Sequence, residues 1–360
     1  MDRRRRLRWL VLSAVLAWTV PVLVAAVPSP VVSSIVVLRP GVALDPLLAR
    51  VGLAGPVQRY EVAFTGFAAD LDPAARARLV ADPGVAAVLP NRSHRAAQLE
   101  GFVRDTPIID NAVHRVGALQ SPTASIDGWD NGVDADIAIV DSGIPYGNPD
   151  LNVVGGVDCT GSGTWEDSVG HGTFVAGLAA ARDDNQGVVG VAPGARLWAV
   201  RVLDGSGSGN WSSVICGVDW VTAHAADIEV ANLSLAGPGA QGSCNDGALR
   251  EAICRSVESG VTYIAAAGNS AVDVSGQVPG SFPEVITVSA LSDYDGLPGG
   301  LGKSTASCAA GRDDTLADFS NYGTGVDLIA PGVCITSTWK GGGYNTTSGT
   351  SMASPHVTGA

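Results

Sequence analysis

Four short segments of the sequence contain residue types that suit acyl transfer from an amide bond. That chemistry needs a nucleophile, a base that takes its proton, a carboxylate that orients the base, and donors for the oxyanion. Asp141 ends an apolar run, and His171 lies between two glycines at the mouth of a small-residue helix. Asn269 follows a second apolar run, and Ser351 lies at a tight turn that opens another helix. Each residue alone would be an ordinary cap or turn, but together they supply every part.

Four segments, in the order Asp, His, Asn, Ser, resemble the signature motifs of the subtilisin family over about residues 106–360. A lipase-type nucleophile-elbow hydrolase needs its acid and histidine after the serine. Only His356 follows Ser351, so that class is excluded. The segments are Ile137–Gly143, Gly170-His171-Gly172-Thr173-Phe174-Val175-Ala176-Gly177, Ala265-Ala266-Ala267-Gly268-Asn269-Ser270 and Gly349-Thr350-Ser351-Met352-Ala353-Ser354-Pro355-His356.

The resemblance implies a role for each matching residue. Ser351 would attack the scissile carbonyl, and His171 would take its proton and return it to the leaving amine. Asp141 would fix the tautomer of the imidazole. The Asn269 amide and the Ser351 backbone N–H would bind the oxyanion. Phe174 stands where the family usually has a second histidine, a position that supports packing.

Two further segments resemble the family strands that clasp an extended peptide, so we expect protein or peptide substrates. Leu235 and Ala236 would line an apolar pocket for the residue before the cut. Ordinary glycine-rich turns are the alternative for these segments. The expected substrate-binding residues are Gly207, Ser208, Gly209, Ser234, Leu235, Ala236, Gly237 and Gly268.

The resemblance implies no cofactor for catalysis, but it raises the question of a structural calcium ion. Asp150 and Asp184 resemble positions that hold calcium in relatives, and oxygen ligands suit this hard cation. Acidic surface loops are also common as solvated turns. The sequence leaves both interpretations open.

The elements that must position these residues alternate between strand and helix from about residue 106. Alternation of this kind predicts an α/β fold, a mainly parallel sheet with helices on both faces. In such sheets functional sites gather at the carboxyl ends of the strands, where the candidate residues lie. The expected strands are Ile137–Val140, Leu197–Val202, Ile228–Leu233, Thr262–Ala266, Val285–Ser289 and Val326–Ile329.

A smaller α/β unit precedes this region, within residues 27–105. It resembles the ferredoxin-like subtilisin prosegment, which chaperones and then inhibits the protease. We expect the chain to cut itself between about Asn91 and Thr106. The expected elements are strands at Ser34–Leu38, Val57–Phe64 and Val85–Leu89, and helices at Leu44–Val51 and Pro73–Ala81.

The chain begins with features of an export signal, which we assign to residues 1–26. Arg3–Arg6 precede an apolar run that ends near Ala26. We therefore expect a secreted protein, with a membrane partner only if the signal stays uncleaved. With export, six cysteines indicate three disulfides. Fifteen pairings are conceivable, and pairing of neighbours in order is favoured; the cysteines are Cys159, Cys216, Cys244, Cys254, Cys308 and Cys334.

Composition excludes other classes of protein. The chain has 360 residues, of which 46% are apolar, so it can bury a substantial core. A net charge of -13 and only two lysines, Lys303 and Lys340, argue against a nucleic-acid partner. The chain stops at Ala360, soon after Ser351, so we expect a domain truncated at its C-terminus. The alternative function is a catalytically inactive or truncated binding protein on the same fold, which would be expected to lack one of the four key residues.

Overall fold

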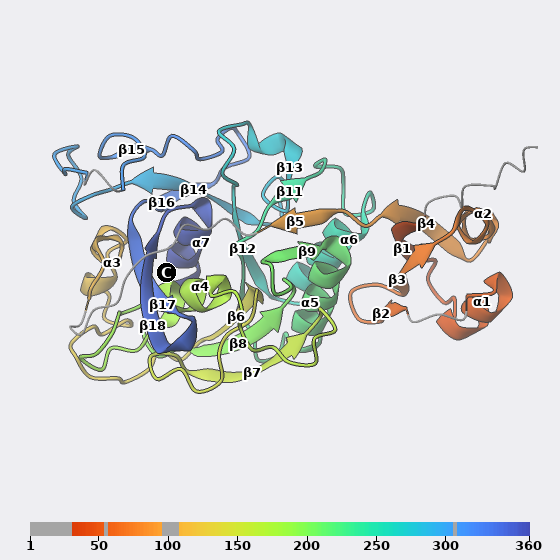
Figure 1. The fold of residues 1–360 in the computed structure, drawn as a ribbon, viewed down its shortest axis with the longest axis horizontal. Coiled ribbons are helices and arrows are strands. Elements are labelled where there is room, and N and C mark those ends of the chain that lie inside the picture. Colours follow the sequence, from red (N-terminus) through yellow and green to blue (C-terminus); the bar gives the residue numbers. More distant parts are fainter. Residues whose placement is uncertain (1–30, 54–56, 96–107, 305–307) are drawn as a thin grey trace, which may run out of the picture.

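A computed structural model of the chain describes residues 31–53, 57–95, 108–304 and 308–360. The predicted signal, residues 1–26, lies outside the described residues, as does most of the expected self-cleavage region. Two units are visible, a small N-terminal one and a larger one that carries the candidate site (Figure 1). In the described part of the chain, no helix has the length and apolar character of a membrane-crossing segment.

The larger unit is built on an eight-stranded sheet in the order β15-β14-β12-β10-β6-β8-β7, with β16 beside β14. Every neighbouring pair is parallel except β14 and β15. The predicted α/β class is therefore confirmed. The strands are β6 Asp136–Asp141, β7 Val153–Asp158, β8 Arg196–Arg201, β10 Val230–Leu233, β12 Thr262–Ala266, β14 Ile286–Ser292, β15 Thr315–Leu316 and β16 Leu328–Pro331.

Helices cover both faces of this sheet, as β6 shows residue by residue. Ile137 and Ile139 pack into the core on the side of α4, whereas Ala138 and Val140 pack on the side of α5. A strand buried on both faces has an uninterrupted apolar sequence, which explains the run at Ile137–Val140. The helices are α4 His171–Ala180 and α7 Thr350–Gly359, which pack together, and α5 Trp211–Ala223 and α6 Ala248–Glu258, which also pack together (Figure 1).

Short elements and disulfides complete the larger unit. The hairpin of β17 and β18 lies against α4 and was not predicted. The disulfides join Cys159 to Cys216, Cys244 to Cys254 and Cys308 to Cys334, the neighbour pairing that the sequence favoured. The short elements are α3 Asn111–Arg115, β9 Ser208–Asn210, β11 Gly237–Pro238, β13 Gln277–Val278, β17 Ile335–Trp339, β18 Gly343–Thr347 and the 3₁₀ turns Ala118–Gln120, Val274–Gly276 and Lys340–Gly342.

The N-terminal unit is an antiparallel sheet in the order β2-β3-β1-β4 with two helices on one face. Strand β1 is buried on both of its faces. Val36 and Leu38 pack under the unit's own helices, whereas Ile35 and Val37 join the core around α5 of the larger unit. The elements are β1 Val32–Leu38, α1 Leu44–Val51, β2 Gln58–Tyr60, β3 Gly66–Leu71, α2 Pro73–Ala81 and β4 Val85–Pro90, followed by β5 Ser93–Arg95.

One predicted strand of this unit was wrong in extent. The expected strand Val57–Phe64 ends at Tyr60, and a second strand begins at Gly66. The intervening turn is held by the larger unit, because the backbone N–H groups of Val62 and Ala63 donate to the Asp219 carboxylate of α5. A contact between residues so far apart in sequence has no local signal.

Candidate active site

Asp141 and His171 form a buried pair at the carboxyl end of β6. Asp141 is the last residue of that strand, and His171 is the first residue of α4. The Nδ1 atom of His171 lies 2.8 Å from each carboxylate oxygen of Asp141, and the two side chains are 1% and 0% exposed. Oδ1 of Asp141 also accepts the backbone N–H of Ser142 at 2.6 Å. This geometry places the proton of a neutral imidazole on Nδ1 and leaves Nε2 free to act as a base.

Opposing effects set the proton affinity of His171. Burial disfavours the charged imidazole, but the negative charge and hydrogen bond of Asp141 outweigh it, and the charge of Asp167 adds to them. The net result is that the pKa of His171 is raised above its usual value. The site therefore favours a positive charge on this imidazole, which is the form a general base takes after it accepts a proton.

Ser351 lies in the first turn of α7, and its side chain is turned toward Ser234. Its hydroxyl donates to the carbonyl oxygen of Ser234 at 3.1 Å. Within the described residues, Nε2 of His171 is buried and has no hydrogen-bond partner. His171 and Ser351 lie in the first turns of two helices, α4 and α7, that pack together. Proton transfer between them requires the serine hydroxyl to leave Ser234, and such bonds are often unformed before substrate binds.

Asn269 is held so that its amide nitrogen is available as a donor. It follows β12, and its Oδ1 accepts both the backbone N–H and the hydroxyl of Thr350 at 2.8 Å. Thr350 Oγ1 in turn accepts the backbone N–H of Gly268 at 3.0 Å. Because Oδ1 is fixed, the orientation of Nδ2 is fixed as well. Asn269 Nδ2 and the backbone N–H of Ser351 can donate hydrogen bonds to a developing oxyanion, which the positive end of α7 also stabilises.

The two expected substrate-binding segments have different surroundings. Strand β9, which contains Ser208 and Gly209 and follows Gly207, pairs antiparallel with β5 of the N-terminal unit. A segment of the same chain therefore already runs along β9 in the manner of an added strand. Gly207 has a φ of +72°, which suits glycine.

The second segment follows β10 and lies deeper than expected. The Ser234 hydroxyl is fully buried and donates to the carbonyl oxygen of Ser351 at 2.9 Å. Leu235 is 1% exposed and belongs to the core that also includes side chains of the N-terminal unit. Ala236 is half-buried, and Gly237 pairs with Val278 between β11 and β13. The Leu235 side chain therefore packs inward while the N-terminal unit is in place.

Within the described residues, neither Asp150 nor Asp184 belongs to a group of three or more side chains close enough to hold one metal ion. Asp150 is 5% exposed, and its Oδ2 accepts the Tyr344 hydroxyl at 2.7 Å. Burial raises the pKa of Asp150, partly offset by that hydrogen bond. Asp184 is half-buried and accepts the backbone N–H of Gln186. Calcium at this place stays a prediction.

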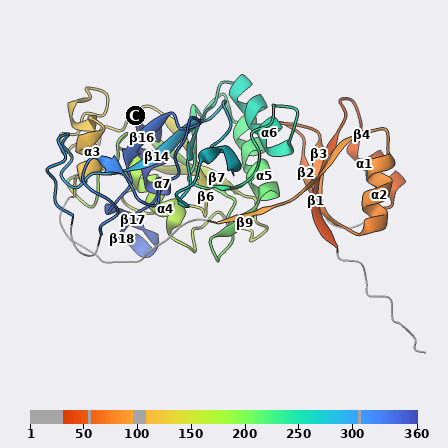
Figure 2. The same ribbon diagram turned by 90° about the horizontal axis from the view of Figure 1, so that it is seen from above.

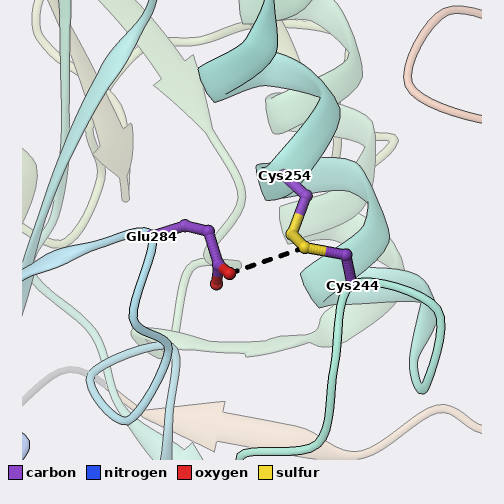
Figure 3. A group of neighbouring side chains, drawn as sticks. All are labelled: Cys244, Cys254 and Glu284. Carbon is purple, nitrogen blue, oxygen red and sulfur yellow. Dashed lines mark hydrogen bonds between the residues drawn. A yellow bond between two sulfur atoms is a disulfide. The ribbon is translucent and has the colours of Figure 1, made fainter.

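Two other groups of acidic or sulfur-containing side chains lie close together in the described part of the chain. One contains Cys244, Cys254 and Glu284, but its sulfurs are bonded to each other, and Glu284 Oε1 lies 3.5 Å from the Cys244 sulfur (Figure 3). A disulfide offers no thiolate for a metal. The other contains Asp293, Asp295 and Asp313. Arg115 lies 3.3 Å from Asp293 Oδ2 and supplies a positive charge there.

Sequence reasoning missed three residues that support the site: Ser142, Asp167 and Thr350. Thr350 orients Asn269, and Ser142 contacts both Asp141 and the first turn of α4. Asp167 contacts Ser142 and that same turn. A signal for Asp167 was present, because an aspartate shortly before a helix start is a common cap.

Comparisons with known proteins point to one family. A model of the subtilase family matches residues 132–360, and a model of peptidase inhibitor I9 matches residues 45–97. The chain is 36% identical over 311 residues to Subtilisin NAT of Bacillus subtilis subsp. natto, which covers 85% of this chain and 72% of that protein. It is 37% identical over 246 residues to Subtilisin Savinase of Lederbergia lenta, covering 68% and 81%.

A solved structure gives the same result. The crystal structure of a cold adapted subtilisin-like serine proteinase matches with a TM-score of 0.54 and 32% identity, over 70% of this chain and 82% of that one. The chain therefore belongs to the subtilase family, as a serine endopeptidase zymogen with an N-terminal I9-type inhibitory prosegment.

Proposed function

We propose that this chain is a secreted, self-processing endopeptidase in which Asp141, His171 and Ser351 form the catalytic triad. The observation that carries the proposal is the buried contact of His171 Nδ1 with Asp141, at 2.8 Å, on a helix that packs against α7, whose first turn contains Ser351. A fixed imidazole with a free Nε2 is what a serine nucleophile needs for activation.

The proposed reaction proceeds through an acyl-enzyme. The Ser351 hydroxyl leaves the Ser234 carbonyl, gives its proton to His171 Nε2 and attacks the scissile carbonyl carbon. Asn269 Nδ2 and the Ser351 N–H stabilise the oxyanion. His171 then protonates the leaving amine as the C–N bond breaks, and water hydrolyses the ester by the same steps in reverse. Asp141 stabilises the imidazolium throughout.

The N-terminal unit would act as an intramolecular inhibitor. Pairing of β5 with β9 supports this role, because it places prosegment backbone where a substrate strand would be added. We assign residues 27–105 to this prosegment and residues 106–360 to the catalytic domain. The matched ranges 45–97 and 132–360 fall inside these bounds.

Secretion is supported by the basic and apolar start of the sequence and by three disulfides. Structural calcium at Asp150 and Asp184 is a separate proposal. A calcium chelator should lower the melting temperature of the wild type but not that of an Asp150→Asn variant. Equal effects on both would contradict calcium at this place.

Substitution of the proposed nucleophile tests the function directly. Ser351→Ala should abolish casein hydrolysis and removal of the prosegment, because one nucleophile serves both cuts. The loss should be roughly a million-fold, the magnitude known for triad removal in a subtilisin. Ser270→Ala, an exposed serine beside Asn269, is the matched control and should keep both activities. Normal prosegment removal by the Ser351→Ala variant in a protease-free host would contradict self-processing.

A further inference from the structure

A second buried carboxylate, that of Asp167, lies close to the proposed triad, and its hydrogen bonds go to Ser142 and to the segment around the start of α4. Asp167 is 5% exposed. Its Oδ1 accepts the Ser142 hydroxyl at 2.9 Å and the backbone N–H groups of Val169 and Gly170 at 2.8 Å. Its Oδ2 accepts both the backbone N–H, at 2.9 Å, and the hydroxyl of Thr173. Every partner is a donor, which is the environment of an ionised carboxylate.

These donors belong to the segment that carries His171. The residue before α4 is Gly170, which has no side chain to cap the helix. Asp167 caps Thr173, and Ser142 Oγ accepts the backbone N–H of Gly172 at 2.9 Å. Two free amides of the first turn are thereby satisfied by side chains from outside the helix.

The same network reaches Asp141. Ser142 donates its hydroxyl to Asp167 and its backbone N–H to Asp141 Oδ1. A rotation of Asp167 would therefore disturb the strand end that carries Asp141 and the helix start that carries His171 together. The positions of Asp141 and His171 therefore both depend on Asp167.

We propose that Asp167 is a positioning residue of the catalytic site: it fixes the helix start of His171 against Asp141, and its negative charge stabilises the imidazolium that forms when Ser351 is activated. This inference rests on the proposed triad.

The charged groups around His171 agree with that proposal. Asp141 and Asp167 both act to raise the pKa of His171, against the effect of burial. The nearby cations instead face the backbone of the segment before α4. Arg201 of β8 donates to the carbonyl oxygen of Glu166 at 2.7 Å, and Lys340, after β17, donates to that of Ser168 at 2.9 Å. The Glu166 carboxylate accepts the backbone N–H of Tyr146 at 3.2 Å, and α7 contributes the neutral hydroxyl of Ser351 and the buried His356.

Asp167→Asn is the direct test, because it removes the charge and places an NH₂ group among donors. In the full chain, after maturation, kcat for a peptide substrate should fall about ten- to a hundred-fold per titrated active site, with KM nearly unchanged. The acid limb of the pH profile of kcat/KM measures the pKa of His171 in the free enzyme. It should move to lower pH by about 0.3 unit or more, because His171 loses a stabilising negative charge.

Two further variants separate positioning from charge and from stability. Ser142→Ala keeps the Asp167 charge and the backbone N–H bond to Asp141, but it removes the hydroxyl that connects Asp167 and Gly172 to the end of β6. We therefore expect kcat to fall while the acid limb moves less. Asp110→Asn is a matched control. Asp110 caps α3 and also accepts the backbone N–H of Thr336 at 2.9 Å, so its loss should lower stability without moving the acid limb.

A variant that fails to mature is still informative in the uncleaved chain. Nuclear magnetic resonance titration of His171 in a Ser351→Ala background should show a lower pKa when Asp167→Asn is added. Unchanged kcat and acid limb in Asp167→Asn, or an unchanged imidazole titration, would overturn the inference. Failure of the triad itself is a different outcome, since the wild type would then not be acylated by a serine-directed active-site titrant.

Discussion

At the scale of single residues, two aspartates approach the start of α4 and do different work. Asp141 contacts the imidazole of His171 itself, whereas Asp167 contacts only amides and hydroxyls around it. The first can stabilise charge on the ring at short range. The second holds the backbone from which the ring projects. Catalytic precision of this kind requires that side chains behind the reacting groups be fixed.

His356, further along α7, is a buried histidine for which we expect a structural role. It is 0% exposed, and burial lowers its pKa from 6.5 to about 4, an effect that the nearby backbone of Met352 and Pro331 offsets only in part. Between pH 6.5 and 4 the unfolded chain therefore binds a proton that the folded chain does not. Folding stability contributed by neutral His356 should be present above pH 6.5 and lost progressively as the pH falls to about 4.

His356→Gln tests this pH dependence. In the inactive Ser351→Ala background, which prevents self-digestion, urea midpoints should fall less steeply from pH 6.5 to 4 with His356→Gln than without it. Above pH 7, His356 is neutral in both the folded and the unfolded chain. The urea midpoints of the two proteins should therefore change equally with pH in that range. Identical slopes across the acid range would show that His356 does not supply this dependence.

The residues proposed for catalysis could be proposed from the sequence, but the contacts of the residues that support them could not. Asp141, His171, Asn269 and Ser351 each lie in a short motif whose order is informative. Thr350 and Ser142 lie in the same motifs, yet their partners come from other strands and helices. A hydroxyl has no sequence signal for which distant amide it will meet, so only the fold assigns its role.

At the scale of elements, α4 depends on a hairpin more than 150 residues away in the chain. Ser337 and Thr338 of β17 donate their hydroxyls to the carbonyl oxygens of Phe174 and Thr173 at 2.7 Å. Phe174 is fully buried and packs edge-on against Trp339 at 6.2 Å between ring centroids. The position where the family usually has a second histidine therefore serves packing in this chain.

Gly170, the residue before His171, is one point where this support limits substitution. Its φ is +106°, and an added Cβ would lie 2.6 Å from the Trp339 ring. Gly170→Ala should cost roughly 3 kcal/mol or more, from left-handed backbone strain and overlap with the ring, and should lower kcat by displacing His171. Urea unfolding and active-site-normalised kinetics would measure both effects.

Gly161 supplies the matched control for that substitution. It also has a positive φ, +81°, but an added Cβ would meet nothing within 4 Å. Gly161→Ala should therefore cost only the backbone strain, about 1–2 kcal/mol, and leave kcat unchanged. Equal losses for the two variants would mean that contact with Trp339 does not matter.

The fold itself was predictable where apolar runs are long and poorly predictable where they are short. The strands around β6, β10 and β12 lie close to their expected positions because burial on both faces demands continuous apolar sequence. Strand β7 contains two adjacent glycines, Gly155 and Gly156, and was missed. Its side-chain-free positions fit beneath Trp198 and Ala199 of β8, which only the assembled sheet shows.

At the scale of the whole molecule, the prosegment is bound by several separate contacts. Ile35 and Val37 pack into the core around α5, and β5 pairs with β9 (Figure 2). Tyr60 is fully buried and donates its hydroxyl to the carbonyl oxygen of Ser212 at 3.1 Å. A further contact is the turn before β3, whose amides donate to Asp219. Dissociation of the prosegment would expose an apolar face on both partners, so its release should be slow.

Asp219 is the contact that can be removed without touching the proposed catalytic residues. It lies on α5, and its Oδ1 accepts the backbone N–H groups of Val62, at 2.9 Å, and of Ala63. Hydrogen bonds to a charged group contribute about 1.5–3 kcal/mol. Asp219→Ala should therefore weaken prosegment binding roughly ten- to a hundred-fold and shorten the lag before casein hydrolysis begins. Activity per titrated active site after complete prosegment removal should equal that of the wild type.

Charge alone could alter the lag, because the chain is already strongly acidic, with a net charge of -13. Asp227→Ala removes the same charge from an exposed position just after α5, where the side chain has no hydrogen bond to the described part of the prosegment. If the lag shortens only with Asp219→Ala, the turn is held by directed hydrogen bonds and the inhibitory contact extends well beyond the strand pairing at β9. Equal shortening by both variants would instead mean that general electrostatics governs release, and the hydrogen bonds to Asp219 would then contribute nothing specific to inhibition.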